Sequence, residues 1–410
     1  MTNEVKIVPK LRFPGFESNW KEEKIKTLFK VVSGTTPLRS KKEYFDKAEV
    51  PWVKTTDLNN NVLRITDEKI SNIAVKEVNM RILPENTLLI AMYGGFNQIG
   101  RTGIISFKST INQAISALLD IEGKSDVNYL QAYFNYNVQK WKRLAASSRK
   151  DPNITKKDVE NFKITIPTLK EQKRMGEFFS KLDRQIELEE QKLEKLEEQK
   201  KGYMQKVFSQ ELRFKDENGN EYPEWEDKKL LNVIAIQNGY AFKSNLFSEK
   251  GMPIIRITDI NKSTVKKGTV YYPESIEINE RFKIKQYDIL IAMSGATTGK
   301  VGKYISEKPS LLNQRIGKFV MKKGTDNNFM FIYLNSLYFK KELSKLLVAG
   351  AQPNISSQDI ENINLFIPIN EEQRKIGEFF NELDELIEKQ SSKIGVLKQR
   401  KKGFLQKMFV

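Results

Sequence analysis

The chain has 410 residues, a net charge of +17 at pH 7, and neither cysteine nor histidine. Disulfides, thiolate nucleophiles, the usual zinc sites and the commonest general base are therefore excluded. This composition counts against an enzyme, and the basic charge favours a polyanionic partner such as nucleic acid over a role in solubility alone.

The first ten residues, 1–10, are predicted to form a loose arm without the apolar core of a signal peptide. The sequence contains no run of the roughly 18 uncharged apolar residues that a membrane helix needs. We therefore expect a cytoplasmic protein with no membrane association.

The first domain is predicted to span residues 1–165 and to mix short strands with helices. Trp20 leads into a stretch expected to be helical, 21–29. Strand-like runs follow at 50–58 and 88–92, and the second is continuously apolar, as in a buried strand. It leads into a glycine-rich loop, 93–101, and a helical stretch is expected at 127–147.

A long helix is predicted next, at 166–210, and it recurs at 367–410 with a constant offset of 201 residues and no gap. Shared blocks include Ile-Pro, Glu-Gln, Gly-Glu-Phe-Phe, Leu-Asp and Lys-Lys-Gly. Each helix of about 40 residues would be about 60 Å long. Because the repeat is far too long for a solenoid, it indicates duplication of a globular unit plus a helix.

The two helices share a heptad pattern of apolar residues, which predicts an intramolecular antiparallel coiled coil. A single core-facing stripe on each solvated helix is the alternative. Both patterns are interrupted by polar residues at matching places, Glu189 and Lys200 in one helix and Gln390 and Lys401 in the other. The predicted packing residues are Phe179, Leu182, Ile186, Leu193, Leu196, Tyr203, Phe380, Leu383, Ile387, Ile394, Leu397 and Phe404.

The second domain, 211–366, repeats the elements of the first. Trp225 leads into an expected helical stretch, 226–235, strands are predicted at 252–260 and 289–293, and a helical stretch at 327–348. The two helices carry net charges of only +1 and +2, which leaves +14 for the rest of the chain. Without regular strand–helix alternation, the fold class is α+β, with two duplicated domains joined by two long helices in a pseudo-two-fold arrangement.

The sequence matches the motifs of nucleotide-binding enzymes, methyltransferases and nucleases only weakly. The loop 295–301 resembles a phosphate loop, but it is one residue short and has Val301 where Ser or Thr would bind the metal. A methyltransferase would need a cofactor loop and a Pro-Pro-aromatic motif, and the chain has no Pro-Pro. Acid-x-Lys triplets that a nuclease would use are common by chance in so charged a chain.

Polar residues of the loops suit DNA, since Arg and Lys contact phosphates and guanine edges, and Asn and Gln contact adenine edges. Asn112-Gln113 and Asn313-Gln314 are shared by both domains, so they serve either DNA contact or the fold. The other predicted DNA-binding residues are Arg39, Lys41, Lys42, Lys54, Thr56, Asn97, Gln98, Arg101, Arg143, Arg149, Lys150, Lys243, Arg256, Thr258, Asp259, Thr297, Thr298, Lys300 and Arg315.

The doubled organisation resembles the specificity subunit of Type I restriction-modification systems over essentially the whole chain. The residues that carry the resemblance are the IP-EQ-GEFF-LD blocks at 166–183 and 367–384 and the KKG ends at 200–208 and 401–409. Leu-Ile-Ala-Met before each glycine loop and Pro-Asn-Ile near each domain's end add to it.

The resemblance implies a non-catalytic protein whose two target-recognition domains each read half of a bipartite double-stranded DNA target. The long helices would set the spacing between the halves. Two methyltransferase subunits, and then motor-nuclease subunits, would join the complex. S-adenosylmethionine, ATP and Mg would belong to those partners, with no cofactor or metal in this chain. Alternatives are an unfamiliar nuclease or methyltransferase, and a coiled-coil scaffold or inactive competing subunit.

Overall fold

The computed structural model describes residues 8–121, 123–146, 152–261, 263–348 and 354–410. Its contacts divide the chain into two compact units. The first unit comprises Met1–Gln191 and Ser391–Val410, and the second comprises Lys192–Gln390. Each unit therefore holds one globular domain and one segment of each long helix. The predicted domain boundaries fall at the ends of the long helices, whereas the units divide each helix near its middle.

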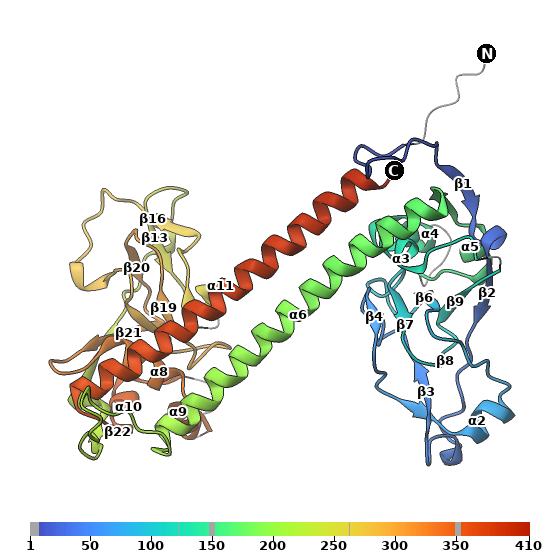
Figure 1. Ribbon diagram of the computed structural model, residues 1–410. Helices are drawn as coiled ribbons and strands as arrows, with labels where there is room; N and C mark the ends of the chain where they lie inside the picture. The colour runs from blue at the N-terminus through green and yellow to red at the C-terminus, as the bar shows by residue number, and fades with distance from the viewer. Residues whose placement is uncertain (1–7, 122, 147–151, 262, 349–353) are drawn as a thin grey trace. The chain divides into compact units, whose positions relative to one another are not determined.

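The first domain combines three small sheets with short helices (Figure 1). Its strands are β1 (Lys21–Lys24), β2 (Phe29–Ser33), β3 (Val50–Val53), β4 (Val62–Leu63), β5 (Lys69–Ile70), β6 (Leu88–Ala91), β7 (Thr102–Ile105), β8 (Thr110–Ile111), β9 (Ile115–Asp120) and β10 (Lys163–Ile166). Its helices are α1 (Ile25–Leu28), η1 (Lys42–Tyr44), α2 (Asn72–Glu77), α3 (Val127–Tyr136), α4 (Val138–Ala146) and α5 (Lys156–Asn161), followed by the long helix α6 (Leu169–Phe208).

The largest sheet of this domain has the order β2-β9-β6-β7-β4. All four residues of β6 are buried, as its apolar run predicts for a central strand. A second sheet, β5-β3-β8, contains the parallel pair β3–β8. Leu88 and Ile90 share a core with Tyr133, Phe134 and other residues of α3, so this helix covers one face of the larger sheet.

The second domain repeats this plan with longer sheets, β12-β21-β18-β19-β15-β14 and β16-β13-β20-β17. Its strands are β11 (Glu226–Lys229), β12 (Ile234–Asn238), β13 (Met252–Ile255), β14 (Ile260–Asn261), β15 (Thr264–Val265), β16 (Val270–Tyr272), β17 (Lys283–Ile284), β18 (Ile289–Ala292), β19 (Val301–Tyr304), β20 (Ser310–Leu312), β21 (Ile316–Met321) and β22 (Asn364–Ile367). Its helices are α7 (Leu230–Val233), η2 (Ser244–Leu246), η3 (Ile257–Asp259), η4 (Glu280–Phe282), α8 (Asn327–Asn335), α9 (Leu337–Val348) and α10 (Ser357–Glu361), followed by the long helix α11 (Asn370–Met408).

The α+β prediction is confirmed, while two of the predicted helical stretches, 21–29 and 226–235, are only partly helical, at α1 and α7. Residues 21–24 form strand β1, which pairs antiparallel with β10 from Lys21↔Ile166 onward, and only the single turn α1 separates it from β2. Residues 226–229 form β11 and pair with β22 in the same way. Local sequence favoured a helix, but pairing with a strand more than 130 residues away overrides that preference.

The two predicted helices at 127–147 and 327–348 are each divided in two. Asn137 ends α3 and donates its side-chain amide to the Tyr133 carbonyl at 2.9 Å. In the second domain the Ser336 hydroxyl accepts the Phe339 amide at 3.3 Å, as an N-cap of α9 does. Short polar side chains thus mark the breaks in two otherwise helical stretches.

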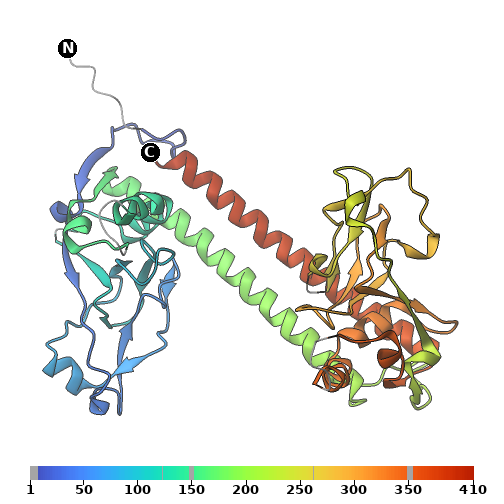
Figure 2. The same ribbon diagram turned by 180° about the vertical axis from the view of Figure 1, so that it is seen from behind.

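Segments of α6 and α11 pair antiparallel within each unit, and both views show them side by side (Figures 1 and 2). In the first unit the rings of Phe178 and Phe404 lie 5.1 Å apart and Lys401 binds Asp183. In the second unit the rings of Tyr203 and Phe379 lie 5.2 Å apart and Lys200 binds Asp384. The coiled-coil prediction is confirmed.

The lysines that interrupt the heptad pattern are the residues that make these ion pairs. Lys200 and Lys401 each bind the aspartate of the other helix's Leu-Asp block, and Lys393 adds a pair with Glu189. Polar contacts at otherwise apolar positions commonly fix helix register, because any shift would leave a half-buried charge unpaired.

The predicted packing residues differ in burial. Phe179 and Phe380 lie in the domain cores, because the preceding residues, Phe178 and Phe379, face the opposite helix. Tyr203 is 38% exposed at the rim of its contact with Phe379. Of the others, Ile186, Ile394 and Leu397 are buried, while Leu182, Leu193, Leu196, Leu383, Ile387 and Phe404 are half-buried.

The shared sequence blocks attach each domain to its long helix. Glu171, which is 1% exposed, accepts two hydrogen bonds from Arg12 at 2.7 and 2.8 Å. Gln172 accepts the Asp126 amide at 3.0 Å, at the start of α3. A Cβ at Gly176 would lie 2.0 Å from the Asp126 Oδ1 atom, so glycine permits close approach of α3 and α6.

The second unit has the same contacts between equivalent residues. Arg213 donates two hydrogen bonds to Glu372, both at 2.9 Å, and Gln373 accepts the Asp326 amide at 2.9 Å. A Cβ at Gly377 would lie 2.9 Å from the Asp326 Oδ1 atom. The sequence blocks are therefore alike because they form the same contacts between a domain and its long helix in both units.

The C-terminal end of α11 packs into the core of the first domain, and the C-terminal end of α6 packs into the core of the second domain. Phe409 follows α11 and stacks on Phe179 at 5.6 Å in the first unit, beside Trp20 and Tyr129. Phe208 ends α6 and packs between Trp225, Phe329 and Tyr333 in the second unit. Each core is thus built from residues far apart in the chain.

Candidate nucleic-acid interface

In the first unit the loops that carry the predicted residues Lys54, Thr56, Asn97, Gln98 and Arg101 meet at one end of the main sheet. The backbone amide of Asn112 donates to the Val53 carbonyl at 2.9 Å, so the loop after β8 lies against the end of β3. Met92, at the end of β6, accepts the Ile154 amide and donates to the Ala114 carbonyl, both at 2.8 Å. The glycine loop is therefore bracketed by the loops around 54–57, 112–114 and 153–155.

The second unit assembles its loops in the same way. Met293 donates to the Arg315 carbonyl at 2.9 Å and accepts the Ile355 amide at 3.0 Å. The Gln314 amide donates to the Tyr240 carbonyl at 2.9 Å, and the Thr297 hydroxyl donates to the Ile257 carbonyl at 3.4 Å. We call these two sets of loops the first and second loop ends.

A short turn holds a threonine outward at each loop end. The Asp57 carboxylate accepts the Lys54 amide at 2.7 Å, and the Asp259 carboxylate accepts the Arg256 amide at 2.8 Å. The threonine between them, Thr56 or Thr258, is exposed. Asp259, predicted to contact DNA, thus uses one carboxylate oxygen to hold the turn.

The glycine loops have a backbone that side chains rarely adopt. Gly94 and Gly95 have φ angles of 119° and 111°, and Gly295 and Gly299 have φ angles of 82° and 84°. Strands β7 and β19 follow these loops, and no helix begins there. This is a further reason against a phosphate loop at 295–301, because that motif places its phosphates at the start of a helix.

Polar atoms under these loops are buried without a hydrogen-bond partner among the described residues. They include the Gln98 Oε1 atom in the first loop end, and the Arg256 Nε and Ser294 Oγ atoms in the second. A buried polar atom left unpaired is costly, so such atoms often mark a place where a ligand or water binds. Ser294 was not among the predicted residues.

Three of the predicted cations are already engaged by carboxylates. Glu68 binds Arg39 with one oxygen at 2.8 Å and Lys54 at 3.0 Å. The hydrogen bond from Arg39, and then that from Lys54, lower the pKa of Glu68 to about 2. Lys41 donates to Tyr44 at 2.9 Å and to Glu77 at 3.0 Å, which raises the pKa of Lys41.

Other predicted residues are open to solvent. Asn97, Lys300 and Arg315 are exposed at the loop ends, and Arg101, Thr297 and Thr298 are half-exposed there. Lys42 starts η1, Lys243 precedes η2 and Arg143 lies in α4, all exposed. Arg149 and Lys150 lie outside the described residues.

The Asn-Gln pairs divide between the two roles proposed for them. The Asn112 side chain accepts the Ala114 amide at 3.2 Å, and the Asn313 side chain accepts the Arg315 amide at 3.3 Å. Both asparagines therefore shape a turn in the same way. Gln113 and Gln314 are exposed, so their side chains are available for contacts.

Exposed aromatic residues are the functional candidates that sequence reasoning missed. Phe96 in the first glycine loop is 47% exposed, and the Lys142 ammonium lies 5.2 Å from its ring centroid. Tyr240 at the second loop end is 42% exposed. Aromatic rings beside cations suit contact with bases or sugars. An aromatic residue between glycines is the sequence signal that could have identified Phe96.

Two negative findings hold for the part of the chain that the structure describes. No group of three or more His, Cys, Asp or Glu residues could hold a metal ion there. None of the described helices is long and apolar enough to cross a membrane.

Comparison with known proteins gives a consistent result over both units. The family described as Type I restriction modification DNA specificity domain matches residues 17–198 and again 222–398. The specificity subunit of the Type I restriction enzyme MjaVIII from Methanocaldococcus jannaschii is 31% identical over 96% of this chain and 92% of its own length. The MjaIX specificity subunit of the same organism is 23% identical over 95% of this chain and 92% of its own length.

A solved structure supports the fold. The crystal structure of a Type I restriction-modification S subunit from M. genitalium superposes with a TM-score of 0.66, at 16% identity, over 98% of this chain and 99% of that one. The family model covers both repeats and the M. jannaschii relative spans nearly the full chain. This chain therefore belongs to the family of Type I restriction-modification DNA specificity subunits.

Proposed function

We propose that this chain reads a bipartite, asymmetric DNA target and directs methyltransferase and motor-nuclease subunits to it, without catalysing a reaction itself. The observation that carries the proposal is the pair of loop ends. They share one frame of turns and glycine loops, yet they present different side chains. Two different half-sites would require two domains of the same fold with different residues in the loops that contact DNA.

The first loop end presents Thr56, Phe96, Asn97 and Arg101, while the second presents Thr258, Thr297 and Lys300 at related places. Arginine and lysine favour guanine edges or phosphates, and asparagine favours adenine edges. Each loop end would therefore select its own bases. The +14 charge outside the long helices would attract the DNA backbone to both domains.

The paired helices would set the distance between the two half-sites. Their register is fixed by ion pairs that recur in both units, Asp183 with Lys401 and Lys200 with Asp384. Major-groove faces recur about every 34–36 Å along DNA, so a spacer of fixed length would allow only certain separations between half-sites. A one-residue change in spacer length would then alter the spacing that is recognised.

Two methyltransferase subunits would supply S-adenosylmethionine and flip target adenines out of the duplex. ATP and Mg would be bound by the motor-nuclease subunits, and the assembly would act in the cytoplasm. A coiled-coil scaffold, or an inactive competing subunit, is the second candidate. It would assemble with the same partners and leave methylation unchanged.

The test is methylation-sensitive long-read sequencing of a host that carries the cognate methyltransferase subunit, with and without this gene. We expect N6-methyladenine at one interrupted motif only when the gene is present. Unchanged methylation, with the proteins still co-purifying, would favour the scaffold. Methylation or cleavage of DNA by the isolated chain would contradict the absence of catalysis.

A further inference from the structure

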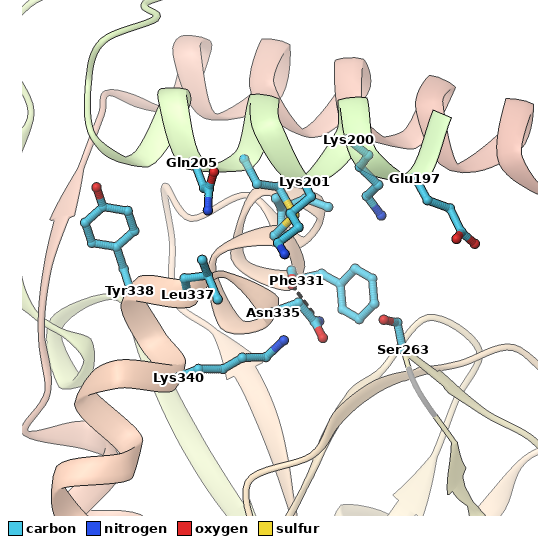
Figure 3. Close-up of a pocket in the computed structure, with 12 residues that line it drawn as sticks. Glu197, Lys200, Lys201, Gln205, Ser263, Phe331, Asn335, Leu337, Tyr338 and Lys340 are labelled. Carbon is cyan, nitrogen blue, oxygen red and sulfur yellow. Dashed lines mark hydrogen bonds between the residues drawn. The ribbon is translucent and has the colours of Figure 1, made fainter. Parts of the chain in front are cut away.

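The second unit contains a hollow of about 270 Å³ between the last turns of α6 and the α8–α9 corner (Figure 3). Lys200 and Lys201 line it from α6, and Lys340 lines it from α9. Phe331, Leu337 and Tyr338 supply much of its apolar wall. Figure 3 shows Lys201 and Lys340 reaching toward the same space from the two helices. None of the predicted DNA-binding residues is among the described residues that line this hollow.

The hollow is strongly basic. Lys200 is bound by Asp384, but the described residues show no ion pair for Lys201 or Lys340, which are both exposed. Lys303 lies against the lining residue Phe331, with its ammonium 4.5 Å from the centroid of the ring. Burial lowers the pKa of Lys303 despite the nearby Asp384 and Asp326 carboxylates. Glu197 is the carboxylate among the described lining residues, so cations outnumber it.

The rim of the hollow is apolar to an extent unusual for a solvated helix corner. Leu337 is 51% exposed and Tyr338 is 44% exposed, side by side at the start of α9. A DNA backbone would gain from the lysines and little from these side chains. A protein segment would gain from both, because apolar anchors surrounded by charges are typical of protein interfaces.

At the corresponding corner of the first unit, polar side chains of α3 bind the neighbouring loop. There Gln131 stands where α8 has Phe331, and its amide donates to the Asn61 carbonyl at 3.0 Å. Asn135 donates to the Asn60 carbonyl at 2.9 Å and accepts the Thr102 hydroxyl at 2.8 Å. In the second unit Asn335 donates instead to its own helix, at the Phe331 carbonyl, 3.0 Å away.

We propose that this hollow docks an acidic segment of a partner subunit, with an apolar side chain of that segment seated against Leu337 and Tyr338. The inference rests on the proposed function, in which partner subunits assemble on this chain. In the first unit Gln131 and Asn135 bind the neighbouring loop at this place, so the proposal concerns the second unit. Such a contact would distinguish the two halves of an otherwise repeated molecule.

The test uses the full chain assembled with its purified cognate methyltransferase and motor-nuclease subunits. A photo-crosslinking p-benzoylphenylalanine replaces Tyr338, and the matched control replaces Gln139, the exposed second residue of α4, as Tyr338 is of α9. We expect position 338 to crosslink to an acidic stretch of one partner subunit and position 139 not to. A crosslink from 338 to DNA, or no protein crosslink, would overturn the inference.

A charge-reversal pair gives an independent readout. Lys201→Glu with Lys340→Glu should weaken assembly with the crosslinked partner at least tenfold and remove its salt dependence. Lys402→Glu, at the position equivalent to Lys201 in the first unit, should change assembly less than twofold. The methylated motif should keep its sequence in every variant. A complex that methylates its motif but shows no loss with the reversed lysines would refute this inference alone, whereas absence of any motif with the wild-type chain would refute the proposed function.

Discussion

Two glycines in the long helix α6 differ in what surrounds them. A Cβ at Gly176 would lie 2.0 Å from the Asp126 Oδ1 atom and 2.8 Å from the Tyr129 amide nitrogen, whereas nothing lies within 4 Å of a Cβ at Gly202. Gly176→Ala should therefore destabilise the protein by about 2–4 kcal/mol, through overpacking and loss of the α3 cap. Gly202→Ala should stabilise it by about 0.5–1 kcal/mol, since alanine favours helix.

Urea unfolding of both variants beside the wild type measures this difference. Equal effects of the two substitutions would show that α3 does not pack against α6 at Gly176. Far-ultraviolet circular dichroism should confirm that both variants keep their helices below the transition.

Glu68 predicts a pH dependence at the first loop end. Its pKa falls to about 2 because Arg39 and Lys54 bind the carboxylate, whereas the usual value is 4.5. A depressed carboxylate pKa stabilises the fold above about pH 4.5 and loses that contribution as pH falls toward 2. After screening by solvent, the contribution should be about 1 kcal/mol.

The measurement is the difference in thermal midpoint between wild type and Glu68→Gln at pH 6, 4.5 and 3. The difference should be largest at pH 6 and should narrow toward pH 3. A constant difference across this range would mean that the carboxylate is not bound to its two cations.

Lys300 is the residue for which the DNA-contact prediction is simplest to test. It is exposed beside Gly299, which has a positive φ, and its side chain is not needed by the turn. Lys300→Ala should weaken DNA binding by the assembled complex at all sequences and reduce the salt slope by about 1, as loss of one phosphate contact does. Lys215→Ala, at an exposed position near the start of the second domain, is the charge-matched control.

Fluorescence anisotropy with a labelled duplex at several salt concentrations provides the readout for Lys300. If Lys300→Ala and Lys215→Ala behave alike, the second glycine loop does not contact the backbone. If Lys300→Ala changes the motif itself, the residue reads a base.

For single residues, the sequence predicts which side chains are candidates for DNA contact better than it predicts which neighbours those side chains bind. Arg39 and Lys54 were identified as candidate DNA contacts, but Glu68, which engages both, lies at the other end of a loop. The unpaired Ser294 hydroxyl had no sequence signal at all. Which charges remain available depends on tertiary contacts, and no local pattern specifies them.

At the scale of secondary-structure elements, the pairing of α6 with α11 allows the most specific prediction. Burial raises the pKa of Asp183 although Lys401 lies against it, so the pair is held in a partly desolvated place. Lys401→Ala should cost about 2–3 kcal/mol, because it leaves that carboxylate without a partner. Lys398→Ala should cost at most about 0.5 kcal/mol, since its partner Glu190 is 47% exposed.

A double-mutant cycle completes this test. Asp183→Asn combined with Lys401→Ala should recover most of the loss caused by Lys401→Ala alone, as measured by urea unfolding. Additive effects of the two single changes would contradict a direct contact. The equivalent pair in the second unit, Lys200 with Asp384, allows the same cycle to be repeated.

The long helices were predictable because their pattern extends over about 40 residues and occurs twice. The short strands β1 and β11 were not, because they exist only through pairing with β10 and β22. The heptad pattern also placed Phe179 and Phe380 on the seam, while the structure turns Phe178 and Phe379 toward the other helix. In each pair of adjacent phenylalanines, one packs against the other long helix and one packs in the domain core. Periodicity alone does not tell which residue does which.

For the whole molecule, duplication explains both what is shared and what differs. The joints built by Arg12 with Glu171 and by Arg213 with Glu372 are the same, so their blocks are alike. The loop ends share a frame and differ in side chains, so each would read its own half-site. The repeated blocks were enough to predict the fold and the family. The DNA sequence that the protein recognises depends on loop geometry, and no simple code relates that geometry to bases.

The central claim is that each domain reads one half of the target, and replacing one domain tests it most directly. Residues 211–366 would be exchanged for the matching domain of the M. jannaschii MjaVIII relative, and N6-methyladenine mapped in a host with the cognate methyltransferase. We predict a motif in which one half changes and the other half and the spacing stay the same. An unchanged motif, or a change in both halves, would contradict the account.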